Sequence, residues 1–136
     1  MSTAESGPGT ERLRLGPLEQ QVMEQLWERG ELTVRELIAQ LGDRHAYTTI
    51  ATVLTNLDRK GLVAHRRVGR SAHYGPRLSR AEHAARLMGE ALSGSTDRRA
   101  SILRFVEGMD AQDVALLREF LGREHPPSAS GEVRPT

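Results

Sequence analysis

The sequence predicts a mainly α-helical protein with one small β-hairpin, and two observations lead to this prediction. Apolar residues recur every three to four positions in three segments between residues 17 and 60, which is the period of an amphipathic helix. Two short β-prone stretches follow at residues 62–67 and 71–75, on either side of a glycine. Three helices followed by a hairpin are the order of a winged helix-turn-helix domain, and helical periodicity from residue 79 onward predicts an appended helical region.

The first two helices have recognisable start signals. Pro17 suits the first helical position, where its missing N–H would be unpaired in any case, and Gly30 suits the end of that helix. Thr33 and Glu36 form the capping-box pattern T-V-R-E, which places the start of the second helix at residue 33. The apolar faces expected to pack inward are Leu18, Val22, Met23, Leu26 and Trp27 in the first helix, and Val34, Leu37, Ile38 and Leu41 in the second.

A third helix, expected at residues 47–60, presents two different faces. Its apolar side consists of Ile50, Val53, Leu54 and Leu57. Its other side carries short hydrogen-bonding groups and a cation, which are Thr48, Thr49, Thr52, Thr55, Asn56 and Arg59. Because threonine is a mediocre helix former, four of them in eight positions are an odd choice for a plain solvated face. Such side chains bond base edges and phosphates, so this face is expected to enter the major groove of DNA.

The hairpin, which is the wing of such a domain, adds arginines without an acidic neighbour. Gly69 supplies the turn that joins its two strands. Arg66 and Arg70 are the expected DNA contacts, and Arg70 is the stronger candidate because it stands at the tip. Side chains alternate between the two faces of a strand, so only one of Arg66 and Arg67 is expected to face the DNA. The residues expected to pack against the helices are Leu62, Val63, Val68 and Tyr74.

The helical region after residue 79 is expected to join two copies of the chain. Short amphipathic helices bury little surface by themselves, and recognition helices work in pairs on palindromic half-sites. Dimerisation is therefore the better interpretation, and folding back onto the winged domain is the alternative. The expected dimerisation residues are Met88, Leu92, Ile102, Phe105, Val106, Leu117 and Leu121.

Composition and charge favour binding to a polyanion and argue against a metal site or an enzymatic activity. Between residues 44 and 77, seven Lys or Arg accompany a single acid, Asp58, although the net charge of the whole chain is only +1; such a basic block attracts polyanions. The chain has no cysteine, its histidines lack metal-ligand spacing, and no nucleophile motif is present. We therefore expect no metal, no cofactor and no enzymatic activity. Without a signal peptide or a long apolar run, we expect no membrane insertion and a cytoplasmic location.

These observations divide the chain into four parts. Residues 1–12 are expected to be a flexible tail, residues 13–77 a winged-helix DNA-binding domain, residues 78–125 a helical dimerisation region, and residues 126–136 a second flexible tail. DNA binding is the leading interpretation. Two alternatives remain open: a ligand-responsive winged-helix regulator with a small-molecule site at its dimer interface, and a winged-helix module that binds protein, because fold alone does not decide function.

Four stretches taken together resemble the penicillinase-repressor (BlaI/MecI) family of winged-helix regulators. They are LGPLEQQVMEQLW, TVRELIAQL, AYTTIATVLTNLDRKGLV and the wing GRSAHYGP, and the resemblance extends over residues 15–121. It implies a homodimeric transcriptional repressor on palindromic operators with TACA/TGTA-like half-sites, commonly controlling β-lactam-resistance genes. It also implies that the groove-facing positions are Thr48, Thr49, Thr52 and Asn56, with the wing contact near Arg70.

The chain departs from the family pattern in two places. Many members carry arginine at the position of Asn56, so we expect a phosphate or guanine contact to be missing and the operator preference to differ. Family repressors are released through a membrane sensor-protease pathway that leads to cutting in the dimerisation region, typically at an Asn-Phe bond. The matching site here is Arg104-Phe105, although Phe105 also reads as an ordinary residue of the apolar stripe.

Overall fold

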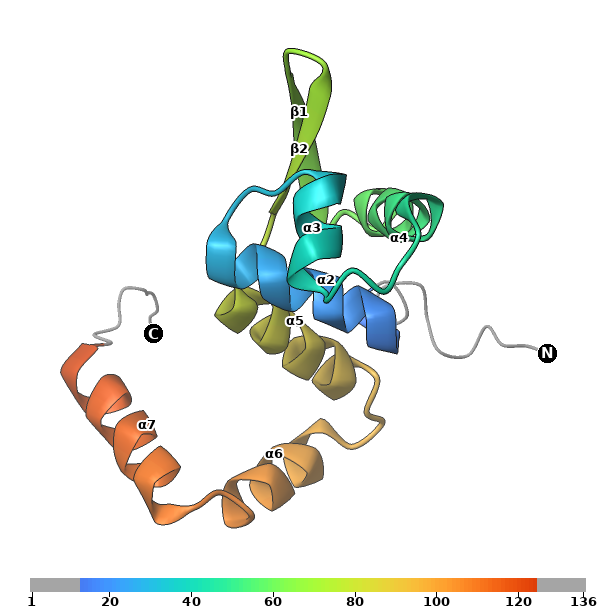
Figure 1. Cartoon of the computed structure of the whole chain (residues 1–136). Coiled ribbons are helices and arrows are strands. Elements are labelled where there is room, and N and C mark those ends of the chain that lie inside the picture. The colour runs from blue at the N-terminus through green and yellow to red at the C-terminus, as the bar shows by residue number, and fades with distance from the viewer. Residues whose placement is uncertain (1–12, 125–136) are drawn as a thin grey trace. The chain divides into compact units, whose positions relative to one another are not determined.

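The computed structural model describes residues 13–124, which belong to two compact units, one ending at Ser93 and the other beginning at Gly94. The first unit has the winged-helix order that the sequence predicts (Figure 1). Its elements are α2 (Pro17–Arg29), α3 (Val34–Gln40), α4 (Tyr47–Arg59), β1 (Val63–Val68), β2 (Ser71–Pro76) and α5 (Arg80–Ser93). The second unit contains α6 (Arg98–Glu107) and α7 (Ala111–Glu124). The tails expected at residues 1–12 and 126–136 lie outside the described residues.

The predicted caps start the first two helices. Pro17 opens α2, and the Glu19 carboxylate accepts a 2.9 Å hydrogen bond from the backbone N–H of Gly16. At α3, Thr33 Oγ1 accepts from the Glu36 N–H at 3.1 Å, while the Glu36 carboxylate accepts from the Thr33 N–H at 2.8 Å. Two N–H groups that the helix leaves unpaired are thereby satisfied. The capping box that the sequence predicts at α3 is confirmed.

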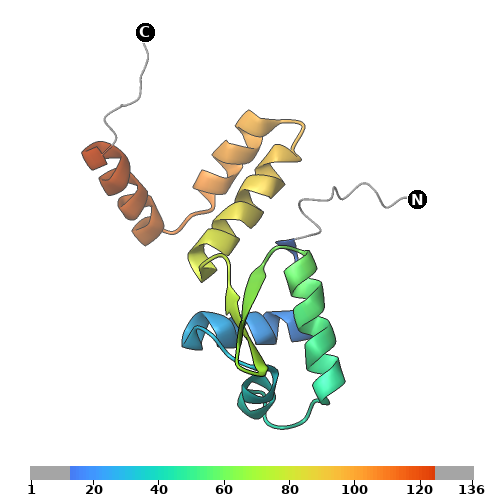
Figure 2. The same ribbon diagram turned by 90° about the horizontal axis from the view of Figure 1, so that it is seen from above.

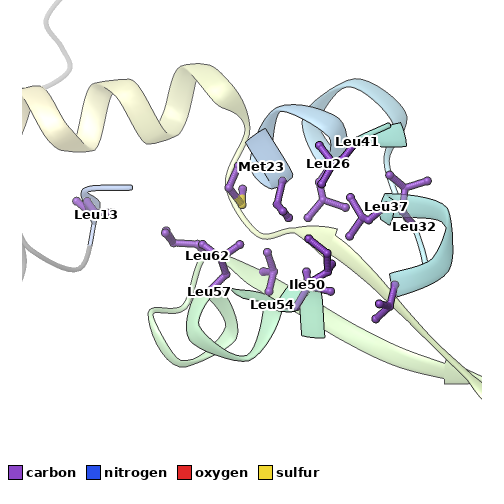
Figure 3. Close-up of a cluster of buried hydrophobic side chains, with 13 residues drawn as sticks. Leu13, Met23, Leu26, Leu32, Leu37, Leu41, Ile50, Leu54, Leu57 and Leu62 are labelled. Carbon is purple, nitrogen blue, oxygen red and sulfur yellow. The ribbon is translucent and has the colours of Figure 1, made fainter. Parts of the chain in front are cut away.

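The hydrophobic core lies where α2, α3, α4 and the base of the hairpin meet (Figure 3). It contains no aromatic residue among its buried members, which are Leu13, Val22, Met23, Leu26, Leu32, Val34, Leu37, Leu41, Ile50, Leu54, Leu57, Leu62 and Val63. Full burial of one such side chain contributes about 1.5–3 kcal/mol. Three of these residues belong to α4, so the core holds that helix by its apolar side and leaves the opposite side in solvent.

The hairpin projects from the helices as a two-stranded antiparallel ribbon (Figures 1 and 2). Val68 pairs with Ser71, which leaves Gly69 and Arg70 as a two-residue turn. Gly69 has φ = 64° and Arg70 has no positive φ, a combination that fits a type II′ turn. The prediction that Val68 packs against the helices is wrong: its side chain is 45% exposed, because it lies at the far end of the ribbon.

Helix α5 packs on α2, so the first unit extends beyond the boundary predicted after residue 77. The ring of His83 is buried, and its Nε2 lies 2.7 Å from the carbonyl oxygen of Leu13. A carbonyl can only accept, so Nε2 carries the hydrogen. Trp27 donates from Nε1 to the Leu78 carbonyl at 2.8 Å, and its ring centroid lies 5.6 Å from that of His83. These contacts join α5 to the first unit, which ends at Ser93.

The second unit consists of two capped helices with exposed apolar side chains. Asp97 accepts from the Ala100 N–H ahead of α6, and Asp110 accepts from the Asp113 N–H ahead of α7, at 3.1 and 2.9 Å. The exposed large apolar residues of this unit are Ile102, Leu103, Phe105, Val106, Leu116, Leu117, Phe120 and Leu121. Within residues 13–124, no helix is both long enough and apolar enough to cross a membrane.

Candidate nucleic-acid interface

The exposed side of α4 carries the polar residues that the sequence assigned to DNA contact. Thr48, Thr49, Thr52 and Thr55 are all exposed, whereas Ile50, Leu54 and Leu57 on the opposite side are fully buried. In the described part of the chain, the hydroxyl groups of Thr48 and Thr52 take part in no hydrogen bond. They can therefore bond to base edges or phosphates without first breaking a contact within the protein.

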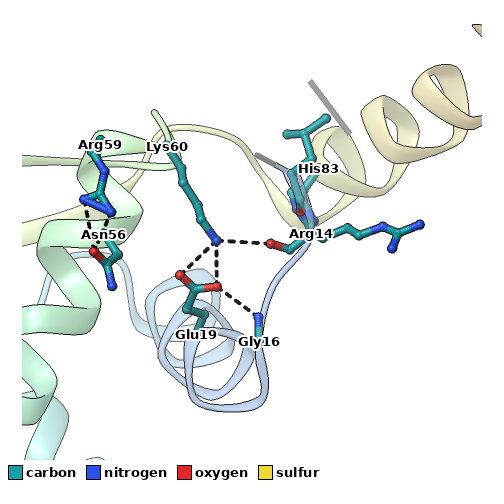
Figure 4. Close-up of polar contacts among 8 residues, drawn as sticks. Arg14, Gly16, Glu19, Asn56, Arg59, Lys60 and His83 are labelled. Atoms are coloured by element: carbon teal, nitrogen blue, oxygen red, sulfur yellow. Dashed lines mark hydrogen bonds and ion pairs between the residues drawn. The ribbon is translucent and has the colours of Figure 1, made fainter. Parts of the chain in front are cut away.

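At the C-terminal end of this face, the polar side chains form hydrogen bonds within α4 itself. Thr55 Oγ1 donates to the carbonyl of Ala51 at 3.0 Å, a bond within the helix. Both terminal nitrogens of Arg59 donate to Oδ1 of Asn56, at 3.0 and 2.7 Å (Figure 4). Asn56 and Arg59 thus form a pair, a relationship that helical spacing allows but that the sequence analysis did not identify.

An ion pair anchors the end of α4 to the start of α2 (Figure 4). Lys60 Nζ donates to both carboxylate oxygens of Glu19, at 2.8 and 3.0 Å, and to the Arg14 carbonyl at 3.3 Å. Partial burial disfavours the charged carboxylate, but the hydrogen bonds from Lys60 and Gly16, together with the positive charge of Lys60, outweigh it and lower the pKa of Glu19 below its ordinary value. Lys60 is therefore committed to positioning the helix.

On the wing, Arg66 pairs with an acid from the α2–α3 connection. Its Nε lies 3.1 and 2.9 Å from the two carboxylate oxygens of Glu31, and its Nη2 lies 2.7 Å from one of them. The hydrogen bonds from Arg66, reinforced by its charge, lower the pKa of Glu31. The sequence predicted Arg66 as a DNA contact and could not reveal this partner, because 35 residues separate the two.

A groove of about 520 Å³ lies on the other side of the wing, between the hairpin, α3 and the start of α4. Arg67 and Arg70 line it from the wing and Arg35 from α3, and no acid of residues 13–124 lines it. The guanidinium of Arg35 lies over the ring of Tyr47, 5.6 Å from the centroid, and Arg67 donates from Nη2 to the carbonyl of Arg70 at 3.3 Å. The sequence analysis missed Arg35 and Tyr47 as site residues, since neither belongs to the polar face of α4 or to the wing.

The exposed threonine face and the arginine groove lie on neighbouring elements of the first unit. Helix α4 contributes to both, because Tyr47 and Ala51 line the groove while Thr48 and Thr52 point to solvent. Threonine can discriminate bases, and arginine binds phosphate through a planar fork of donors. The first unit therefore presents, side by side, groups that can bond to base edges and groups that can bond to phosphates.

Comparison with known proteins places the chain among transcriptional regulators. The family model described as "Penicillinase repressor" matches residues 15–123. The chain belongs to the penicillinase repressor family. It is 42% identical over 114 residues to "Transcriptional regulator BlaI" of Mycobacterium tuberculosis, in two strains, which covers 79% of this chain and 83% of the relative. The resemblance that the sequence motifs indicated is confirmed, and the protein is a transcriptional regulator and not an enzyme.

Solved structures of regulators are also similar to this chain. An ArsR family transcriptional regulator matches with a TM-score of 0.51 at 16% identity, over 80% of this chain and 98% of that chain. This likeness concerns the fold alone. The solution structure of the DNA binding domain of the repressor BlaI matches 51% of this chain and 87% of its own length, at 27% identity and a TM-score of 0.46.

Proposed function

We propose that this member of the penicillinase repressor family is a homodimeric repressor that binds palindromic operator DNA with TACA/TGTA-like half-sites. Helix α4 lies in the major groove and reads bases through Thr48 and Thr52. The wing and its groove hold the phosphate backbone. Repression acts by occupancy of the operator, because the threonine face and the arginine groove supply binding contacts and no reactive centre.

The observation that carries this proposal is the division of α4 into two faces. Ile50, Leu54 and Leu57 have no exposed surface, so their burial fixes the rotation of the helix about its own axis. The threonine side then has only one orientation, away from the core. A rigid helix with a fixed polar side meets the geometric requirement for direct base readout in the major groove.

The homodimer is supported by the exposed apolar side chains of the C-terminal helices. Ile102, Phe105 and Val106 of α6, and Leu117 and Leu121 of α7, are between 38% and 58% exposed. In the first unit, Met88 is also exposed, and Leu92 is half-buried. Many large apolar side chains left in solvent are typical of a protein interface, and a second copy would double the number of half-site contacts.

Release of the repressor by proteolysis at Arg104-Phe105 is the second part of the proposal. Both side chains are exposed, and within residues 13–124 the side chain of Arg104 makes only a long ion pair, 3.8 Å, with Glu107. The bond itself lies inside α6, however, and proteases cut exposed, locally opened segments most readily. Cutting at this site therefore requires α6 to unwind locally, and we expect the rate of cutting to follow the opening of that helix.

Selection of bound sequences from random duplex DNA by the full chain tests this function. The proposal predicts enrichment of an inverted repeat with TACA/TGTA-like half-sites whose centres lie about 10 bp, or a multiple of this distance, apart. Enrichment of a single unrepeated half-site would contradict the dimer. Recovery of no common sequence would contradict specific operator binding and would favour one of the two alternatives, a ligand-responsive regulator or a protein-binding module.

A further inference from the structure

We propose that the groove between the wing, α3 and α4 binds the sugar-phosphate backbone of one DNA strand through Arg35 and Arg67, and that Arg66 positions the wing without touching DNA. This inference rests on the proposed function and names the residues that carry its backbone contacts. Arg35 and Arg67 are thus contacts to the DNA backbone, whereas Arg66 is not a DNA contact.

The groove is positively charged. Three guanidinium groups line it, those of Arg67 and Arg70 from the wing and that of Arg35 from α3, and no carboxylate from the described part of the chain does. Two exposed arginines elsewhere in residues 13–124 differ from them in lying against acids: Arg66 pairs with Glu31, and Arg80 pairs with Glu24. Cations left without an acid around a shared hollow produce a local positive potential, which a phosphate can neutralise.

Contacts within the protein hold the side chains of Arg35 and Arg67 in place in the absence of a ligand. The guanidinium of Arg35 lies over the Tyr47 ring, a cation–π contact that holds the side chain without using its N–H groups on a hydrogen-bond acceptor. Arg67 is tethered to the carbonyl of Arg70 by one nitrogen only. Side chains ordered in advance lose less conformational entropy on binding. The volume of about 520 Å³ falls in the range of about 300–1,000 Å³ of protein ligand sites, so the hollow has room for a stretch of backbone.

The opposite face of the wing carries Arg66, which is paired with an acid. Arg66 and Arg67 are adjacent in β1, so their side chains leave on opposite faces of the ribbon. Arg66 is bound by Glu31, next to Leu32, whose backbone makes two 2.9 Å hydrogen bonds with Tyr74 of β2. The ion pair and the backbone bridge together fix the base of the wing to the α2–α3 connection. Arg66 is therefore a positioning residue.

The test measures how DNA affinity depends on salt, because each phosphate contact contributes a slope of about −0.9 in log K against log salt. The full chain and three variants, Arg35→Gln, Arg67→Gln and Arg66→Gln, bind the operator duplex and a random duplex at several salt concentrations. Arg35→Gln and Arg67→Gln are each expected to reduce the slope by about 0.9 per subunit, and the affinity roughly eightfold per subunit at 0.1 M salt. Arg67→Lys, which keeps the charge, is expected to retain the slope.

Arg66→Gln is the matched control, since it removes the same charge from the neighbouring position of the same strand. We expect it to lower affinity while leaving the salt slope unchanged. Glu31→Gln gives a second readout of positioning. If Glu31 merely repelled DNA, its neutralisation would tighten binding; because it braces the wing, we expect binding to weaken as it does in Arg66→Gln.

Two results would overturn the inference while leaving the proposed function intact. One is an unchanged slope in both Arg35→Gln and Arg67→Gln, with operator preference retained. The other is a slope in Arg66→Gln that falls as far as in Arg67→Gln. A wild-type chain with neither operator preference nor salt dependence would overturn the inference and the proposed function together. Circular dichroism of each variant establishes that the fold is retained.

Discussion

Lys60, just beyond the C-terminal end of α4, lies 2.8 and 3.0 Å from the two carboxylate oxygens of Glu19 in the first turn of α2. The same carboxylate accepts from the Gly16 N–H, and Lys60 also reaches the Arg14 carbonyl. Both side chains of the pair are largely removed from solvent, with 25% and 15% exposed. Helix α4 is thus fixed to α2 by a polar contact as well as by the core.

Glu19→Gln is expected to destabilise the fold by about 1–2 kcal/mol at neutral pH, because it weakens a partly buried, charge-assisted hydrogen bond. The pKa of Glu19 is lowered in the folded state. Its stabilising contribution is therefore complete above the ordinary carboxyl pKa of 4.5 and is lost as the pH falls below that value through the folded-state pKa. Urea unfolding of wild type and variant at neutral pH and at successively lower pH measures this difference.

Glu28→Gln is the control for this experiment, since Glu28 is an exposed acid of the same helix. Its effect on the free energy of unfolding is expected to stay within about 0.5 kcal/mol at every pH. If Glu19→Gln and Glu28→Gln lose equal stability, or if the loss in Glu19→Gln grows as the pH falls, the role assigned to the Lys60 pair is wrong.

His83→Ala is expected to lower stability by about 2–4 kcal/mol, because it leaves a cavity beside Trp27 and an unpaired carbonyl at Leu13. The melting temperature of the variant measures the loss. His45→Ala serves as the control, since His45 is only half-buried and lies in the loop before α4. Its expected cost is below about 1 kcal/mol. Similar losses of stability in the two variants would contradict a stabilising role for the hydrogen bond between His83 and the Leu13 carbonyl.

Thr52→Ala is expected to relax base preference without changing the slope of log K against log salt, because the proposed contact of Thr52 is with a base and not with a phosphate. The discrimination lost at the contacted base pair is about 1 kcal/mol, at the lower end of the range for a direct base contact. Binding to operators with single base changes measures it. Thr52→Ser keeps the hydroxyl and removes the methyl, which separates hydrogen bonding from contact with a thymine methyl. Equal losses on specific and random DNA would remove Thr52 from the set of base contacts.

Leu117→Glu is expected to produce a monomer, because it places a charge within the apolar surface of α7 that the proposed dimer buries. Sedimentation equilibrium measures the oligomeric state, and operator binding is expected to weaken in parallel. Gln112→Glu adds the same charge at an exposed polar position of the same helix and is expected to leave the dimer intact. A wild-type monomer, or a Leu117→Glu dimer, would contradict the proposed interface.

The helices of the first unit were predictable because their signals are local. The apolar repeat of Ile50, Leu54 and Leu57 fixes which side of α4 is buried, and Thr33 with Glu36 marks the start of α3. Exposure of the threonine face follows from the same periodicity. Its role in base readout remains a prediction.

The features that the sequence did not reveal depend on contacts between distant residues. Glu31 neutralises Arg66, so the face of the wing that carries Arg67 keeps its positive charge. Glu31 and Arg66 are 35 residues apart in the sequence. His83 of α5 contacts Leu13 across 70 residues, and α5 lies within the first unit, which ends at Ser93. Alternation along β1 correctly separates Arg66 from Arg67, but without Glu31 it could not tell which of them faces the groove.

Fluorescence anisotropy of the full chain on a labelled palindromic TACA/TGTA duplex and on a scrambled duplex, at several salt concentrations, tests the central claim most directly. A repressor of this kind is expected to bind the palindrome at least ~10³-fold more tightly than the scrambled duplex, with affinity falling steeply as salt rises. Equal and weak binding of the two duplexes would contradict a repressor specific for such operators.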